Sequence, residues 1–313
     1  MYVVFPGLTS GPMWIHTDTV DRCETSWWKN VLFINNFFPV TDTCLDYGYI
    51  ISLEAQFFVI LVFCVFLARK FPFYAKIGGF VVLAVSITVS FILAYYNDLP
   101  PAPMLTVEPV SSGKMSILFS LMLLSPVTRA STYAVGFIFG LGCVVTDEHL
   151  RTRGFSYKPH ILLGFLCFSC LVYTSSFAFA YASKAQHSPI LDALYAALHR
   201  PVWAFALLSF VYLCYHSAFQ WINALLGWRV FAPLSKLSWV ALLVSEPVIL
   251  YFFSSPNKPT YATHWSTMYT TVSAAVMSYT FALLLDIFVT RPVRYLIYRD
   301  QKQRYEVAHT NAH

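Results

Sequence analysis

Five ionisable side chains and one amide fall inside or at the ends of long apolar segments, where they could do chemistry. They are Glu54, Gln56, Arg129, His216, Glu246 and Asp286. A charged group inside a bilayer is costly, so each of these residues is a functional hypothesis by default. A carboxylate at such depth must pair, stay protonated or line a wet cavity, and Glu54 and Glu246 are therefore the hardest to dismiss.

Arg129 is the natural partner of Glu54, because the two residues begin expected membrane spans on the same side of the bilayer. An ion pair between them would suit a structural role as well as a catalytic one. We expect Glu54→Ala to abolish folding or activity, and normal expression with normal function would contradict an essential buried acid. His216 suits a neutral structural role with hydrogen bonds across helices, and Asp286 lies close enough to the interface to be solvated.

The composition predicts a membrane protein. Hydrophobic residues make up 58% of the chain and charged residues 11%, whereas soluble domains carry about 25% charged residues. Since about 20 apolar residues cross the hydrocarbon as a helix, we expect an all-α fold, a polytopic transmembrane bundle of about seven spans. Residues 115–125 are too short to cross, and they suit a re-entrant or interfacial helix. The expected spans are 49–68, 75–96, 130–147, 160–183, 201–224, 237–254 and 266–289.

The basic residues alternate between the connections. Of the 20 Lys and Arg residues, 13 fall in one alternate set of connections and seven in the other. The positive-inside rule then predicts an extracytoplasmic loop region at 1–48, a transmembrane domain at 49–290 and a cytoplasmic basic tail at 291–313. We expect a multi-pass protein of the endoplasmic reticulum or plasma membrane. The net charge of +5 reflects cytoplasmic loops, and no nucleic-acid partner is expected.

The cysteines fit this topology. Cys23 and Cys44 share the first extracytoplasmic segment, and we expect them to form a disulfide if the compartment is secretory; two free thiols are the alternative. The other cysteines lie in spans as small packing residues, and none has zinc-site spacing, so no metal site is expected. Gly136 and Gly140 have the GxxxG spacing that supports close helix packing. No soluble-enzyme motif is present.

Four groups of residues follow one another at characteristic spacings. They are Gly11-Pro12-x-Trp14 with Cys23 and the run Trp28 to Phe37; Cys44 with Tyr49, Leu53, Gln56 and Phe57; Pro126-x-x-Arg129-x-x-x-Tyr133-x-x-Gly136; and Arg200-x-x-Trp203 with Asn223, Leu226, Trp228 and the run Pro233 to Ser238. In this order the chain resembles the acyltransferase-3 membrane domain, in the nose-resistant-to-fluoxetine subgroup. The resemblance covers nearly the whole chain.

The chain also departs from that family at several chemically important positions. The family's aspartate is Glu54 here, Ser245 stands at the position of a family histidine, and Thr290-Arg291-Pro292 replaces an ExP sequence. The family's early-span histidine, associated with catalysis, would lie upstream of Met1. We therefore expect this chain to be the C-terminal part of a longer domain.

The resemblance implies transfer of an acyl group from a carrier such as acyl-CoA to a hydroxyl acceptor, in contact with membrane lipid and with no bound cofactor. It makes Arg129 and Glu54 the candidate catalytic residues, with Arg129 holding donor phosphates or stabilising charge. The candidate substrate-binding residues are Asn35, Asn36, Gln56, Tyr133, Arg200 and Trp203. Two alternatives stay open: a non-catalytic lipid or small-molecule transport protein, and an inactive fragment.

Overall fold

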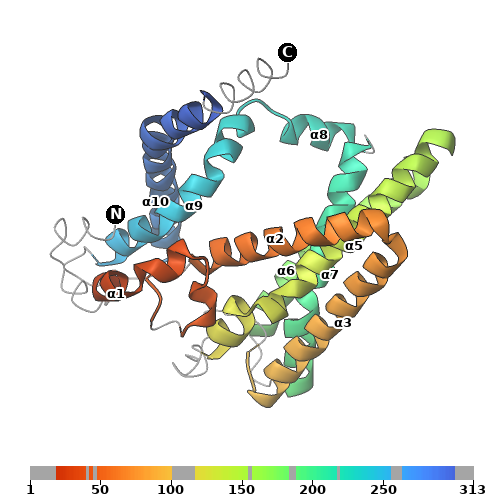
Figure 1. Cartoon of the computed structure of the whole chain (residues 1–313), viewed down its shortest axis with the longest axis horizontal. Coiled ribbons are helices and arrows are strands. Elements are labelled where there is room, and N and C mark those ends of the chain that lie inside the picture. The colour runs from red at the N-terminus through yellow and green to blue at the C-terminus, as the bar shows by residue number, and fades with distance from the viewer. Residues whose placement is uncertain are drawn as a thin grey trace, which may run out of the picture. The chain divides into compact units, whose positions relative to one another are not determined.

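The computed structural model describes residues 19–39, 42–44, 48–100, 117–153, 157–182, 188–216, 219–254 and 263–299. Within these ranges the chain forms helices and no strands (Figure 1), which confirms the all-α fold. Six described helical stretches are long and apolar enough to cross a membrane. The protein is therefore a multi-pass integral membrane protein. The helices are α1 (Thr19–Val31), α2 (Gly48–Lys70), α3 (Pro72–Tyr96), α5 (Pro126–Arg153), α6 (Tyr157–Ala182), α7 (Pro189–Tyr215), α8 (Gln220–Leu226), α9 (Phe231–Ser254) and α10 (His264–Leu285), with the shorter η3 (Asn35–Phe37), η5 (Phe119–Leu124) and η6 (Asp286–Thr290).

Two of the expected spans have different bounds in the structure. The expected span at 201–224 is helix α7, which begins at Pro189 and ends at Tyr215. Pro189 occupies the first turn, where its missing N–H costs nothing, and Pro201 lies inside the helix instead of starting it. The expected span at 160–183 falls in α6, whose described apolar part, Leu163–Ser176, is shorter than a full span.

The segment expected to be a separate re-entrant or interfacial helix leads directly into α5. Phe119–Leu124 forms a π-helix, and one extended residue, Ser125 (ψ 125°), separates it from α5. Counted together, Phe119–Val144 is long enough to cross a membrane. Pro126 stabilises the new start, because proline is pre-organised for the first helical position.

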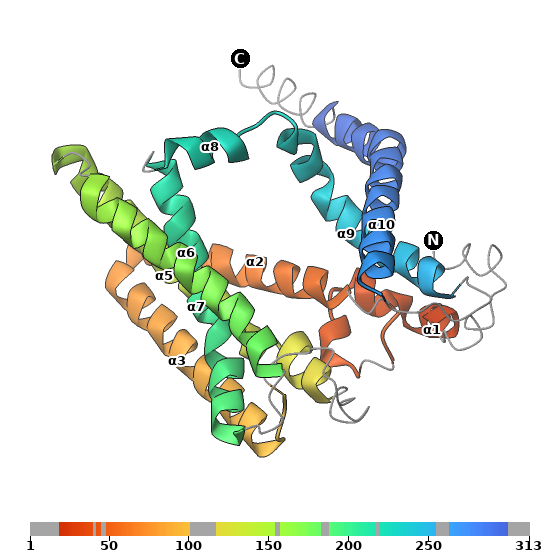
Figure 2. The same ribbon diagram turned by 180° about the vertical axis from the view of Figure 1, so that it is seen from behind.

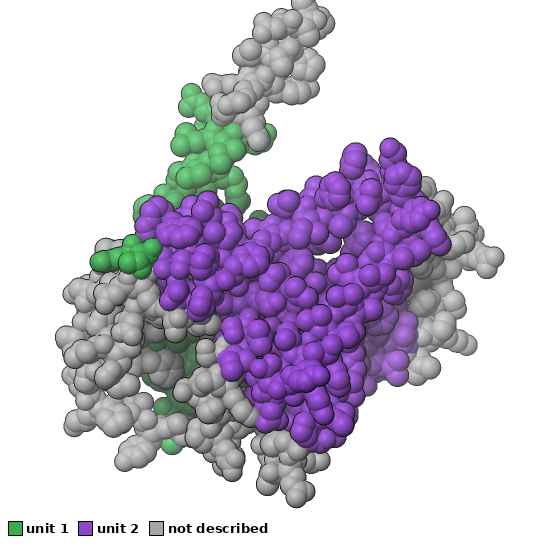
Figure 3. Space-filling model, turned by 60° about the horizontal axis from the view of Figure 1, so that its bottom comes forward, with its two compact units in different colours: residues 1–25, 226–313 green, residues 26–225 purple. Residues whose placement is uncertain are grey.

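The chain divides into two compact units, residues 26–225 and residues 1–25 with 226–313 (Figure 3). In the first unit α7 contacts α3, α5 and α6, while α2 contacts α3 and α5. In the second unit α9 and α10 pack along each other, as both ribbon views show (Figures 1 and 2).

A buried serine ties α3 to the start of α5. The Ser86 hydroxyl donates to the Val127 carbonyl at 2.7 Å and accepts from the Ser131 amide at 3.0 Å. Nearby, Gly79 on α3 approaches α5 so closely that an added Cβ would lie 2.9 Å from Ile138 Cγ1. The first turns of α5, which carry Arg129 and Tyr133, are thereby held in place against α3.

The expected disulfide is present. Cys23 and Cys44 are disulfide-bonded, and Cys64, Cys143, Cys167, Cys170 and Cys214 are free thiols. The bond closes a loop that contains the end of α1 and η3. By contrast, a Cβ added at Gly136 or Gly140 would meet nothing within 4 Å. The prediction that these two glycines mediate close helix packing is therefore wrong in the described fold, and Gly79 makes the tight α3–α5 contact instead.

Candidate functional site

A cavity of about 310 Å³ opens between the first turns of α2 and α5, and we call it the Glu54 cavity. Its lining residues are Tyr49, Ile50, Leu53, Glu54, Arg129, Thr132 and Tyr133. Three of the residues predicted from sequence, Glu54, Arg129 and Tyr133, therefore meet in one place. They come from two helices more than 70 residues apart in the chain.

An apolar contact between α2 and α5 positions the polar groups of this cavity. Tyr49, Leu53 and Phe57 form the buried face of α2 and pack against Leu124. The ring of Tyr133 stacks on Phe57 with 4.0 Å between centroids and 16° between planes. Stacking of this kind fixes the direction of the tyrosine side chain, which lines the same cavity as Glu54.

Glu54 and Arg129 line the same cavity, but they do not form the ion pair expected from sequence. The structure records no ion pair for either residue in the described ranges. Glu54 is exposed and shares the cavity with Tyr133. Arg129 instead donates through Nε to the Leu123 carbonyl at 3.2 Å, with its guanidinium carbon 5.9 Å from the Tyr49 ring centroid. The cavity therefore presents a carboxylate and a guanidinium that form no ion pair with each other.

Arg200 binds the same helix end as Arg129, although it comes from α7. Its Nη1 donates to the Met122 carbonyl at 2.7 Å, so the two guanidiniums hold the carbonyls of consecutive residues. Those carbonyls lie at the end of η5, where the break at Ser125 leaves the last helical carbonyls without their usual partners. Cations are favourable at such a C-terminus. We call Arg129 and Arg200 the guanidinium pair.

The guanidinium pair carries positive charge that no described carboxylate neutralises through an ion pair. Each arginine makes one side-chain hydrogen bond, to a backbone carbonyl. The two positive charges repel each other, because Arg129 and Arg200 donate to the carbonyls of consecutive residues and so lie close together. Two like charges within membrane-spanning helices are unfavourable unless an anion joins them. The remaining N–H groups of the pair are donors of the kind that phosphates and carboxylates bind.

His199 adjoins this pair and was missed by the sequence reasoning. Its Nδ1 lies 2.7 Å from the Tyr195 carbonyl, and its ring stacks on the Tyr195 ring at 4.8 Å. Since a carbonyl only accepts, Nδ1 carries the proton and Nε2 of the neutral ring is a proton acceptor. Arg129 and Arg200 are both near enough to His199 to interact with it electrostatically. The sequence signal was the pair His199-Arg200, which the expected span at 201–224 left outside the membrane.

Asn36 and Gln56 form an amide clamp that holds η3 against α2. Asn36 and Gln56 exchange hydrogen bonds at 3.2 and 2.9 Å, and Gln56 also donates to the Phe33 carbonyl at 2.6 Å. Asn35 is fully buried and donates to Asn30 at 2.8 Å. Phe33 has a positive φ of 57°, a conformation that is costly for a bulky residue. The clamp compensates for this cost, and substrate binding by the three amides stays a prediction.

The remaining sequence candidates lie apart from the Glu54 cavity. Trp203 on α7 is 43% exposed and is not among the residues lining the cavity. His216 is the C-cap residue of α7, against the rings of Tyr212 and Tyr215, and is not deep within a span as expected.

Two acids outside the cavity are both accounted for within the protein. Asp286 forms an ion pair with Arg291 at 2.9 Å. Glu246 is buried, with 5% of its surface exposed, and it has an interaction partner. No group of three His, Cys, Asp or Glu side chains suited to a metal gathers in the described ranges.

Comparison with known proteins finds a nematode protein that is similar to this chain. The chain is 24% identical, over 298 residues, to nose resistant to fluoxetine protein 6 of Caenorhabditis elegans. The match covers 93% of this chain and 36% of the nematode protein, so the chain spans little more than a third of that relative's length. No family model and no solved structure matches the chain. The comparison therefore shows distant homology between this multi-pass membrane protein and nose resistant to fluoxetine protein 6.

Proposed function

We propose that this protein takes part in acyl transfer within the membrane, from a carrier such as acyl-CoA to a hydroxyl acceptor. The observation that supports this proposal most is the guanidinium pair beside the Glu54 cavity. Negative charge develops on the thioester carbonyl of the donor during transfer, and a guanidinium pair that forms no ion pair in the described residues is suited to stabilise it. The distant relation to nose resistant to fluoxetine protein 6 is compatible with the acyltransferase-3 resemblance of the sequence.

The reaction needs a base and a stabiliser of negative charge. In the proposed step the acceptor oxygen attacks the thioester carbonyl, its proton passes to Nε2 of His199, and negative charge develops on the carbonyl oxygen. Arg129 or Arg200 stabilises that charge. The C–S bond then breaks, the carbonyl reforms as an ester, and the leaving thiolate takes up the proton. Glu54 and Tyr133 orient the acceptor hydroxyl in the cavity.

Transport of a lipid or small molecule is the second candidate. The name of the nematode relative links that protein to a response to the small molecule fluoxetine. A cavity with an exposed acid and an arginine would serve binding without chemistry equally well. The two functions differ in whether a covalent product forms.

The test is an acyl-transfer assay with labelled acyl-CoA in membranes that contain the full chain. We expect label in a lipid or other hydroxyl acceptor above an empty-vector control. Arg129→Gln and Arg200→Gln should each lower transfer by about 100-fold, the size of loss seen when one charge-stabilising donor is removed. Arg229→Gln, an exposed arginine of the second compact unit, should leave transfer unchanged.

Two results would count against the proposal. Absence of labelled product with the wild-type chain would reject catalysis by this chain, and retained binding of acyl-CoA in the same membranes would favour the transport function. Equal transfer by the wild type and both glutamine variants would reject the guanidinium pair as the group that stabilises the developing charge.

A further inference from the structure

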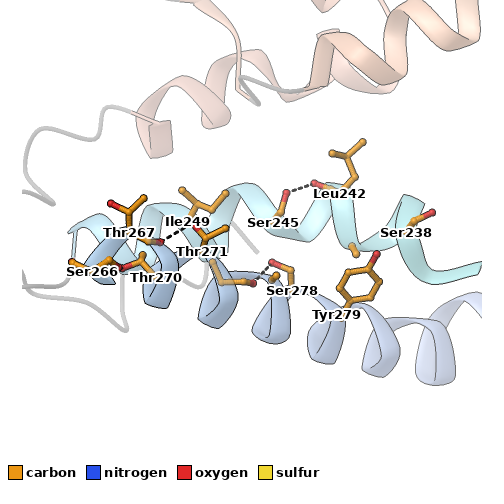
Figure 4. Close-up of a pocket in the computed structure, with 13 residues that line it drawn as sticks. Ser238, Leu242, Ser245, Ile249, Ser266, Thr267, Thr270, Thr271, Ser278 and Tyr279 are labelled. Atoms are coloured by element: carbon orange, nitrogen blue, oxygen red, sulfur yellow. Dashed lines mark hydrogen bonds between the residues drawn. The ribbon is translucent and has the colours of Figure 1, made fainter. Parts of the chain in front are cut away.

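A second cavity, of about 680 Å³, lies between α9 and α10 and shares no lining residue with the Glu54 cavity (Figure 4). We call it the α9–α10 groove. Eight of its 13 lining side chains carry a hydroxyl group and none is charged. The hydroxyl-bearing residues are Ser238, Ser245, Ser266, Thr267, Thr270, Thr271, Ser278 and Tyr279.

Most of these hydroxyls already donate a hydrogen bond to a backbone carbonyl. Thr270 donates to the Ser266 carbonyl at 2.9 Å, Ser278 to the Ala274 carbonyl at 2.7 Å and Ser245 to the Leu242 carbonyl at 2.7 Å. Ser238, Thr267 and Thr271 donate to carbonyls of their own helices in the same way. A hydroxyl has one proton and two lone pairs. Six of the eight groups therefore offer the groove only hydrogen-bond acceptors.

An acceptor-lined, uncharged groove selects for a particular kind of ligand. A molecule with O–H donors gains hydrogen bonds there, whereas one that carries only acceptors leaves the lining oxygens unpaired. The remaining lining residues, Ala241, Leu242, Ile249, Ala274 and Ala275, contact a hydrocarbon body. The absence of a charged lining residue disfavours an ionic ligand, because an unpaired charge in this environment is costly.

We propose that the α9–α10 groove binds a neutral long-chain alcohol, with its hydroxyl donating to the serine and threonine oxygens. The groove's volume of about 680 Å³ falls within the roughly 300–1,000 Å³ of ligand pockets. A transmembrane helix is a less suitable occupant. Its side chains are mostly apolar and would leave the lining oxygens of the groove without donors.

The binding test uses a photoreactive hexadecanol carrying a diazirine, applied to the full chain in lipid nanodiscs. We expect the label on peptides of α9 and α10, with unlabelled hexadecanol competing about 10-fold better than hexadecyl methyl ether. The ether has nearly the same hydrocarbon body but no donor. Equal competition by the alcohol and the ether, or label confined to other helices, would overturn the proposal without any variant.

Matched variants test the lining oxygens. Thr270→Val combined with Ser278→Ala removes two acceptors with little change in shape, and competition by hexadecanol should weaken about 5- to 10-fold. Thr280→Val is the control, because the Thr280 hydroxyl bonds to the Val276 carbonyl at 2.8 Å on the same helix but outside the groove. It should bind as the wild type does.

Each alternative outcome has a distinct signature. Equal binding by the double variant and the wild type, with both eluting as folded protein, would overturn the assignment of the acceptors. Cysteine crosslinks between copies through α9 and α10, with no alcohol labelling, would show a helix in the groove and reject the alcohol. A fold defect in the double variant leaves the alcohol-against-ether comparison on the wild type to decide.

Discussion

Arg129 and Arg200 bind where they do because the helix in front of them stops. Ser125 adopts an extended conformation, so carbonyls at the end of η5 lack partners further along the helix. In an apolar surrounding such carbonyls must be satisfied by other donors. The two arginines supply them at 3.2 and 2.7 Å, and their remaining N–H groups are left for a ligand. The same two side chains thus satisfy the carbonyls of η5 and offer N–H donors to a ligand.

His199 gives the sharpest prediction at the residue scale. If Nε2 takes up the proton of the attacking hydroxyl, His199→Gln should lower acyl transfer by about 100-fold or more while the KM for acyl-CoA changes little. General-base catalysis contributes a rate factor of about 10²–10⁴. His216→Gln is the matched control, because His216 caps the same helix away from the guanidinium pair. Steady-state assays at several pH values would check this, and the low-pH limb of kcat should disappear in the His199 variant.

The opposite outcome for His199 is equally informative. A His199→Gln variant with unchanged kcat would remove His199 from the reaction, and loss of folded protein in that variant alone would assign the residue to the Tyr195 contact.

The amide clamp shows why the type of a residue does not by itself decide whether it binds substrate or stabilises the fold. Asn36 and Gln56 were candidate substrate-binding residues because they belong to the segments that resemble the acyltransferase-3 family. In the fold they bond to each other and to the Phe33 carbonyl. Their pairing across 20 residues of chain is invisible in the sequence, because the chain must turn at Phe33 before the amides can meet.

At the scale of elements, the contact between α3 and α5 positions Arg129 and Tyr133. Gly79→Leu should destabilise the protein by about 1–3 kcal/mol, because a side chain there would overlap Ile138 and force the helices apart. Gly78→Leu is the control, since an added Cβ at Gly78 meets nothing within 4 Å. Thermal unfolding of the two variants in the same detergent measures the difference.

Equal unfolding temperatures for the two variants would mean that α3 and α5 do not approach each other at Gly79. The GxxxG spacing of Gly136 and Gly140 misidentified the contact. A motif of this kind marks a smooth helix face, but which face meets a neighbour depends on how all the helices pack.

Hydropathy located the helices better than it located their ends. Long apolar runs predicted α2, α3, α9 and α10 within a few residues, because the hydrocarbon thickness sets the length of a span. The start of α7 was misplaced at Pro201 instead of Pro189. A proline is compatible with a first turn and with a helix interior in a membrane, so its position alone does not decide.

At the scale of the whole molecule, orientation in the membrane stays a prediction from the basic residues. We expect residues 1–48 outside the cytoplasm and residues 291–313 inside it. In intact cells a glycosylation acceptor placed near residue 30 should be modified, whereas one placed near residue 305 should not. Glycosylation at the C-terminal position would reverse the topology and remove the oxidising environment expected for Cys23 and Cys44.

The sequence by itself predicted an all-helical membrane protein, favoured a Cys23–Cys44 disulfide over two free thiols, and gave Glu54, Arg129 and Tyr133 as candidate site residues. Composition and hydropathy carry the first prediction because the bilayer constrains each spanning segment, whereas the site candidates rest on the resemblance to the acyltransferase-3 family. Only the tertiary structure decided that Glu54 and Arg129 share a cavity without forming an ion pair, and that Arg129 and Arg200 donate to neighbouring carbonyls of η5. It alone brought His199 to the site and formed the α9–α10 groove. These features depend on which helix faces meet, and that is settled by packing across the whole bundle.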